Sequence, residues 1–103
     1  MIERIFGDGK YKFHIGYDEA VEWERKRRKG LYPTMVALLA GDWQVADVTE
    51  VVRVAMIGGG SDPVEAFEIS DRYVRQRPLI ESMQLAIDVL ELAYFGTSEG
   101  DAT

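Results

Sequence analysis

The sequence predicts an α+β fold, mainly α, in which an N-terminal β-hairpin packs on a bundle of four to five helices. Three observations lead to this prediction. Asp8-Gly9 is a two-residue turn signal between short segments rich in β-branched and aromatic residues. Asp47 and Asp62 each stand three residues before a Glu, which is the pattern of a capped helix start. After each of these capped helix starts, apolar residues recur at helical spacing.

The hairpin is expected over residues 2–15, with Asp8 and Gly9 as its loop. This loop sets Phe6 opposite Tyr11, Arg4 opposite Phe13 and Ile2 opposite Ile15. One face of the hairpin then gathers the apolar side chains Ile2, Phe6, Tyr11, Phe13 and Ile15. A lone hairpin is marginal in water, so we expect this face to lie on helices.

Two helices are expected before the middle of the chain. Residues 18–29 carry acidic side chains early and basic ones late, which complements the helix dipole, and Gly30 is expected to end this mostly solvated helix. Residues 32–40 predict a short second helix with Pro33 at its first position, an apolar stripe of Val36, Leu39 and Ala40, and Gly41-Asp42 as its end.

The central helix is expected between two end signals, Asp47 as its N-cap and the triglycine at 58–60 as its stop. Its β-branched residues would also suit a strand, but strict alternation is absent. The expected buried stripe consists of Val48, Val51, Val52 and Ala55, widened by Val54 and Met56. We expect the rest of the chain to pack around this helix.

Two further helices are expected, one from Asp62 to about residue 75 and one over residues 78–95 that Gly96 closes. The last helix carries two apolar stripes. The first consists of Ile80, Met83, Ile87, Leu90 and Tyr94, and its first four residues are expected to face the core of the domain. The second, Leu85, Val89 and Leu92, is either core as well or a surface that binds a partner; these three residues form our partner-binding hypothesis.

Length and composition suit one domain over residues 1–96, followed by a disordered tail over residues 97–103. Of the 103 residues, 47% are hydrophobic and 29% charged, as in ordinary soluble proteins. There is no cysteine, no membrane-length apolar run and no apolar segment of a signal peptide at the start, so we expect a cytoplasmic protein. The net charge of −6 argues against general affinity for nucleic acid.

Nothing in the sequence points to catalysis or to a cofactor. His14 is the single histidine, so a transition-metal site is not expected. No Lys-Ser or Lys-Thr follows the triglycine, so it indicates a helix stop and a tight turn rather than a phosphate loop. The basic run at 25–29 lacks interleaved aromatic residues, which favours a solvated helix end or a partner-facing patch over a nucleic-acid site.

Several segments occur in a specific order and spacing along almost the whole chain. They are the early hairpin, GDWQVADVTEVVRVAMIGGG at 41–60, Ala66, Arg77-Pro78-Leu79, and LAIDVLELAYFG at 85–96. In these segments the chain resembles the small tail proteins of gene transfer agents and related siphophages. That family is classed among phage tail assembly chaperones and is sometimes labelled a tail tube protein.

The resemblance implies a non-enzymatic role without cofactors. Tail assembly chaperones coat the long, apolar tape-measure protein and keep it soluble, and tube subunits then polymerise around it. The leading hypothesis is therefore a tail assembly chaperone of a gene transfer agent or phage-like particle. Its expected partners are the tape-measure protein, other tail proteins and further copies of itself, with no membrane and no nucleic acid. The alternatives are a structural tail tube or connector subunit and a small regulatory nucleic-acid-binding module.

Overall fold

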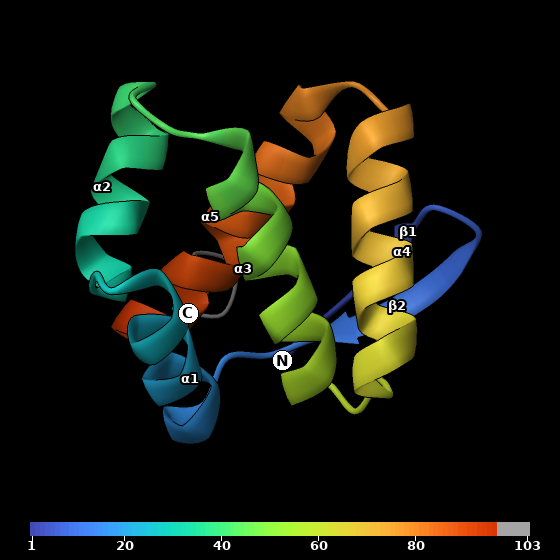
Figure 1. Ribbon diagram of the computed structural model, residues 1–103, viewed down its shortest axis with the longest axis horizontal. Coiled ribbons are helices and arrows are strands. Elements are labelled where there is room, and N and C mark those ends of the chain that lie inside the picture. Colours follow the sequence, from blue (N-terminus) through green and yellow to red (C-terminus); the bar gives the residue numbers. More distant parts are fainter. Residues whose placement is uncertain (97–103) are drawn as a thin grey trace, which may run out of the picture.

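The computed structural model describes residues 1–96; the tail expected to be disordered, residues 97–103, lies outside the described residues. The described chain forms a β-hairpin followed by five helices, which confirms the predicted fold class (Figure 1). The elements are β1 (Ile2–Phe6), β2 (Gly9–Phe13), α1 (Tyr17–Arg27), α2 (Leu31–Ala40), α3 (Val45–Gly58), α4 (Pro63–Gln76) and α5 (Leu79–Phe95). No helix among residues 1–96 is both long enough and apolar enough to cross a bilayer.

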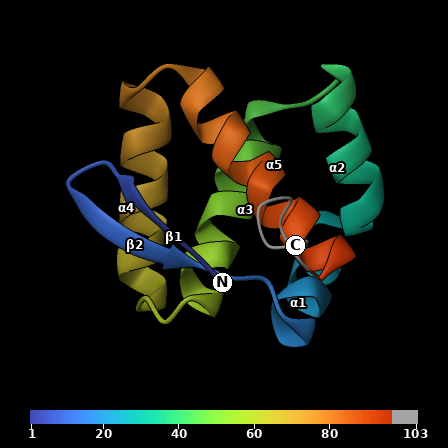
Figure 2. The ribbon, with the colours of Figure 1, turned by 180° about the vertical axis from the view of Figure 1, so that it is seen from behind.

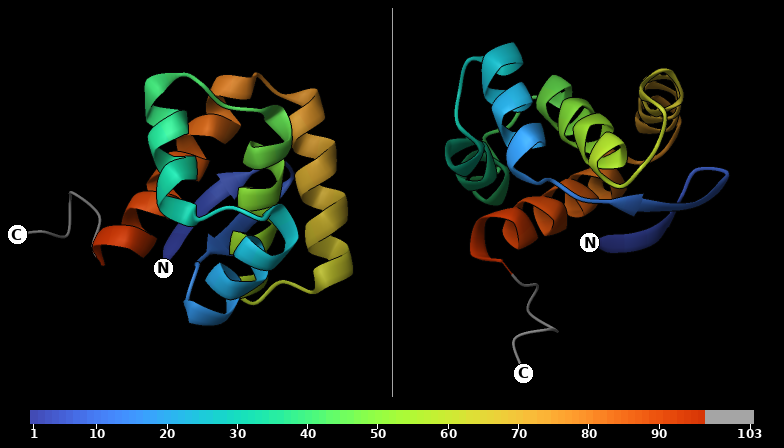
Figure 3. Two further views of the ribbon diagram at one scale, coloured as in Figure 1. Left: turned by 60° about the vertical axis from the view of Figure 1, so that its left-hand side comes forward. Right: turned by 90° about the horizontal axis from the view of Figure 1, so that it is seen from below.

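Helix α3 lies at the centre and contacts α1, α4, α5 and β2. Seen from behind, α5 runs obliquely across α3, and the hairpin lies across α4 (Figure 2). The view from below places α5 and the hairpin on one side of the molecule and α1, α3 and α4 on the other (Figure 3). Because neighbouring elements cover α3 on several sides, its predicted stripe is buried. The stripe residues Val48, Val51, Val52 and Ala55 are almost completely inaccessible to solvent.

The hairpin forms, but its register differs by two residues from the expected one. Gly7 and Asp8 form the loop, so that Phe6 pairs with Gly9 and Ile2 with Phe13. Gly7 has a φ of +64°, which glycine adopts readily, and a Cβ at this position would lie 2.2 Å from the ring of Tyr73 on α4. Because side chains alternate with a period of two, the shift keeps the expected apolar face, and that face packs on the core.

Three expected helix ends are wrong. Helix α1 ends at Arg27 and is capped by Arg28, whereas Gly30 is the N-cap of α2. Because α2 begins at Leu31, Pro33 occupies its third position rather than its first. Helix α3 begins at Val45, so Asp47 lies inside its first turn and is not the N-cap. For Asp47 the reason is a contact between segments, because its carboxylate pairs with Arg27 and Lys29 instead of capping α3.

Other helix ends follow the sequence signals. The carboxylate of Asp62 accepts hydrogen bonds from the backbone N–H groups of Val64 and Glu65, at 3.1 and 3.2 Å. Gly41 and Gly96 close α2 and α5 with φ values of +81° and +84°. These ends depend on one or two residues each, so they can be predicted from local sequence.

Burial corrects two expectations about the first helices. Helix α1 is anchored rather than mostly solvated, because Trp23 is fully buried. Helix α2 buries Thr34, Met35 and Leu38, and the expected stripe of Val36, Leu39 and Ala40 is exposed instead. Because α2 is apolar on nearly every side, helical spacing could not identify its inner face.

The triglycine does more than stop α3. A Cβ at Gly58 would lie 1.9 Å from the carbonyl oxygen of His14, and one at Gly59 would lie 2.0 Å from that of Lys12. The backbone N–H of His14 donates to the carbonyl of Ala55 at 2.9 Å. The glycines therefore let the hairpin backbone lie directly on the end of the central helix.

Candidate functional site

The outer side of α2 is apolar and faces solvent. Alone among the five described helices, α2 has no charged side chain over its ten residues. Tyr32, Val36 and Leu39 stand at i, i+4 and i+7 and therefore form one stripe. Val36 is 44% exposed and Leu39 is 56% exposed. A surface helix normally carries polar residues on its outer side, so this stripe departs from the pattern of a solvated helix.

The C-terminal end of α5 extends this apolar surface. The Tyr94 ring lies against Tyr32, with centroids 4.6 Å apart, and against Phe95, with centroids 5.0 Å apart. Tyr94 and Phe95 are both more than half exposed. We term the surface formed by Tyr17, Tyr32, Val36, Leu39, Tyr94 and Phe95 the aromatic face. Its side chains come from α1, α2 and α5, so it exists only in the folded chain.

A groove of about 270 Å³ opens in the aromatic face between the starts of α1 and α2 and the end of α5. Its lining is Ile15, Gly16, Tyr17, Ala20, Leu31, Met35, Leu90, Ala93 and Tyr94, without a charged side chain. An apolar cavity of about 150 Å³ accepts benzene. The groove therefore has room for one or two apolar side chains of another molecule.

The residues of the partner-binding hypothesis lie elsewhere. Leu85 and Val89 are 4% and 2% exposed and belong to the core, which is the first of the two alternatives left open for their stripe. Leu92 is partly buried and lines a separate hollow of about 240 Å³ beside the hairpin. Their binding to a partner stays a prediction.

The course of α5 explains this burial. Helix α5 contacts α2, α3 and α4, which cover both stripes along its middle. Ile87 and Leu90 are buried as expected, whereas Ile80, near the start of the helix, is exposed rather than core. Tyr94, near its end, is exposed as well. Exposure on this helix therefore depends on position along its length and not on the stripe.

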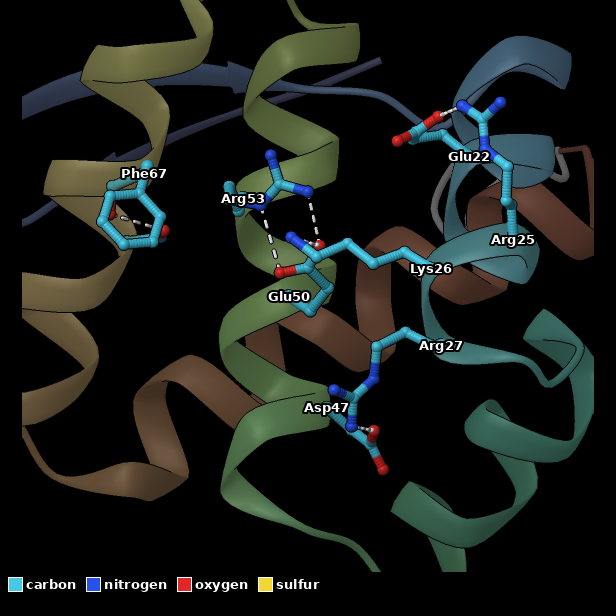
Figure 4. A network of polar contacts seen from close by, with 9 residues as sticks. Glu22, Arg25, Lys26, Arg27, Asp47, Glu50, Arg53 and Phe67 are labelled. Atoms are coloured by element: carbon cyan, nitrogen blue, oxygen red, sulfur yellow. Dashed lines mark hydrogen bonds and ion pairs between the residues drawn. The ribbon is translucent and has the colours of Figure 1, made fainter.

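The basic run at 25–29 is engaged within the molecule. Arg27 Nη2 donates to Asp47 Oδ1 at 2.6 Å, and Lys29 Nζ donates to Asp47 Oδ2 at 2.7 Å. Lys26 Nζ lies 3.1 Å from Glu50 Oε1, and Arg53 also pairs with Glu50 (Figure 4). Asp47 and Glu50 are buried on α3, so these contacts fasten α1 to the central helix. We term this network, Lys26, Arg27, Lys29, Asp47 and Glu50, the α1–α3 clamp.

The clamp carboxylates keep their charge at neutral pH. Burial opposes ionisation of Asp47, but hydrogen bonds from Lys29 and Arg27 outweigh it and hold the pKa below its ordinary value of 3.8. Burial also opposes ionisation of Glu50, but Arg53 and Lys26 outweigh it and hold the pKa below 4.5. Three residues of the basic run therefore hold α1 against α3. This role differs from the solvated helix end or partner-facing patch expected from the sequence.

A larger hollow of about 640 Å³ lies between α3, α4 and the start of α5. Its charged walls are already paired. Arg75 bonds Asp71 at 3.0 Å, and Arg77, also on the wall, bonds Glu81 at 2.7 Å. Across residues 1–96, no three His, Asp or Glu side chains gather as a metal ion would require. The aromatic face, by contrast, is an apolar surface that makes no use of ion pairs and stays exposed.

Comparison with protein-family models matches residues 1–96 to the family described as phage tail tube protein, GTA-gp10. The chain belongs to this family. The match confirms the resemblance seen in the sequence and, with it, a role in the tail of a phage or gene transfer agent. Comparison with curated proteins and with solved structures gives no match.

Membership of the family suggests contacts with other tail proteins, and sequence reasoning missed the aromatic face as a candidate surface for them. One signal was present: a helix of ten residues without a charge, in a chain of which 29% is charged. The stacking of Tyr32 on Tyr94 had no local signal, because these residues are distant in the chain and meet only when α2 packs on α5.

Proposed function

We propose that this tail protein is a non-enzymatic, cytoplasmic assembly chaperone that binds the apolar tape-measure protein while the tail is built. The aromatic face carries the proposal, because it is exposed, contiguous and free of charged side chains. Exposed apolar patches on otherwise charged proteins mark sites for partners. Family membership supports the tail role, and the resemblance to tail assembly chaperones implies that the long apolar tape-measure protein is the tail component that needs cover.

The aromatic face suits a helical segment of the partner. Amphipathic helices bind grooves through apolar side chains spaced at i, i+3, i+4 and i+7. The stripe of Tyr32, Val36 and Leu39 presents a ridge about 10 Å long, and the groove beside Tyr94 receives a side chain from the partner. Aromatic side chains add large contact area with few rotatable bonds, which favours them at binding sites.

The charge of the remaining surface suits a chaperone. The chain carries 18 acidic and 12 basic residues, and none of them lies in α2. Several copies bound along an apolar chain would surround it with protein of net charge −6 per copy. Complexes covered in this way carry the same sign of charge and repel one another, which keeps the bound apolar chain from aggregating.

Co-expression with the tape-measure protein of the same particle tests the proposal. The parent chain is expected to keep the tape-measure protein soluble and to purify with it. Leu39→Glu, which places a carboxylate in the aromatic face, is expected to abolish both effects. Phe67→Glu on α4 is the matched control, because Phe67 is 59% exposed but lies outside the face, and it is expected to behave as the parent. Circular dichroism first establishes that both variants are folded.

Two results would contradict the chaperone proposal. The first is a tape-measure protein that stays soluble and bound with Leu39→Glu. The second is equal loss of binding in both variants, which would mean that added charge, rather than the aromatic face, is decisive.

A structural tail tube or connector subunit is the second candidate, because the family description names a tail tube protein. Purified particles distinguish the two functions by mass spectrometry. A chaperone leaves before the tail is complete, whereas a structural subunit remains in fixed proportion to the other tail proteins. The nucleic-acid module has no comparable support, since three of the five basic residues at 25–29 belong to the α1–α3 clamp.

A further inference from the structure

The charges at both ends of α2 oppose the dipole of that helix. Arg28 and Lys29 precede its N-terminus, and Asp42 follows its C-terminus, whereas a helix dipole favours the reverse order. Lys29 is neutralised by Asp47. Within residues 1–96, neither Arg28 nor Asp42 makes an ion pair, and both are exposed. Two opposite charges therefore stand unused at opposite ends of the exposed stripe.

Arg28 also holds a backbone conformation that favours glycine. Its φ and ψ are 58° and 36°, and it is the one non-glycine residue with positive φ in the described part of the chain. Its N–H donates to the carbonyl of Glu24 at 2.8 Å and closes α1. Glycine would close the helix without strain. The arginine side chain therefore adds something that the cap does not need, namely a cation beside the start of α2.

We propose that a second copy of this chain covers the aromatic face, with the two α2 helices packed antiparallel about a twofold axis. In this pair, Tyr32 of one copy lies against Leu39 of the other, and Val36 lies near the axis. Arg28 of each copy lies at the same end as Asp42 of the other copy. Each α2 dipole also runs against its neighbour. Charges that oppose the dipole in one copy thus become complementary in the pair.

Charge and symmetry favour a second copy on this face. A twofold interface brings the same patch of both copies together, so a charged patch would meet its own charge. Two copies that each carry −6 repel, and α2 is the described helix that adds no charge to the contact. The helix is about 15 Å long, so the contact is small and the association is expected to be weak. Another tail protein could then displace the second copy.

The inference uses the aromatic face and does not depend on the tape-measure partner, so it is tested on the purified protein alone. Sedimentation equilibrium over about a hundredfold range of concentration is expected to show a reversible dimer. Leu39→Glu places two carboxylates in the contact and is expected to raise the dissociation constant by about a hundredfold or more. Phe67→Glu is expected to leave the constant unchanged.

A charge exchange tests the antiparallel arrangement itself. Arg28→Asp and Asp42→Arg each set like charges together at both ends of the pair, and each is expected to weaken the dimer about tenfold. The double variant restores opposite charges and is expected to return within about threefold of the parent. Asp tolerates the left-handed conformation better than most residues, so Arg28→Asp keeps the α1 cap. Lys10→Asp serves as the control for Arg28→Asp, because it makes the same change in net charge. Lys10 is exposed and has no ion pair in residues 1–96.

Three outcomes would overturn the proposal: a monomer at every concentration, a dimer that survives Leu39→Glu, or single charge variants that the double variant does not rescue. Because no tape-measure protein is present, each of these outcomes leaves the chaperone proposal standing. Conversely, failure of the tape-measure protein to purify with the parent leaves the dimer standing.

Discussion

Replacing Leu38 and Leu39 separately by alanine tests which side of α2 faces the core. The two residues are neighbours in one helix, so both changes remove the same atoms and alter helix propensity equally. Leu38 is 2% exposed and belongs to the core, whereas Leu39 is 56% exposed. Buried Leu→Ala changes cost about 2–5 kcal/mol, and exposed ones stay within about 0.5 kcal/mol. We expect Leu38→Ala to lower the free energy of unfolding by about 3 kcal/mol and Leu39→Ala by less than about 0.5 kcal/mol.

Urea unfolding measures both values, at a protein concentration low enough that self-association adds nothing to stability. A domain of this size is expected to unfold with a free energy of about 5–15 kcal/mol, so a loss of about 3 kcal/mol clearly moves the urea midpoint. The urea dependence itself is expected to stay the same in both variants. Equal losses, or a larger loss for Leu39→Ala, would refute the orientation of α2. The stripe of Tyr32, Val36 and Leu39 could then not be the exposed side of α2, and the aromatic face would not exist as described.

Two further predictions concern the packing around α3. Asp47→Asn removes the charge that holds Arg27 and Lys29, and we expect it to cost about 1–3 kcal/mol at neutral pH. Because the folded pKa of Asp47 is lowered, its contribution is present above the unfolded pKa of about 4 and is lost as the pH falls through the folded value. Parent and variant are therefore expected to converge in urea unfolding at acid pH, and a constant difference down to about pH 2 would argue against the clamp. Gly58→Ala is expected to destabilise the protein by about 1–3 kcal/mol, because the added Cβ would lie 1.9 Å from the His14 carbonyl oxygen. Helix propensity alone would favour alanine by about 0.5–1 kcal/mol. Thermal unfolding measures the effect, and a raised melting temperature would contradict the prediction.

The sequence by itself determined the order of the elements and the features that depend on a few neighbouring residues. The carboxylate of Asp62 caps α4, and Gly41 and Gly96 end α2 and α5, because the backbone conformation at each end is decided locally. The buried stripe of α3 was also predictable, since its apolar spacing is regular and the helix is surrounded. The order and spacing of such segments carried the resemblance to the family, and the family match over residues 1–96 confirms it.

Only the tertiary structure decided how these elements use their side chains. A carboxylate near a helix start suits either a cap or an ion pair. Asp47 forms ion pairs, because packing brings Arg27, the last residue of α1, and Lys29, just after α1, next to it. A hairpin register shifted by two residues keeps the same apolar face, so alternation cannot detect the shift; the close packing of Tyr73 on Gly7 accompanies the observed loop.

The face of α2 was likewise undetermined, because a helix that is apolar on nearly every side has no periodic signal to orient it. Its neighbours orient it: α2 packs Leu38 inward and leaves Leu39 outside, and α5 brings Tyr94 onto Tyr32. The aromatic face is therefore a product of long-range packing, which joins residues that no local pattern connects.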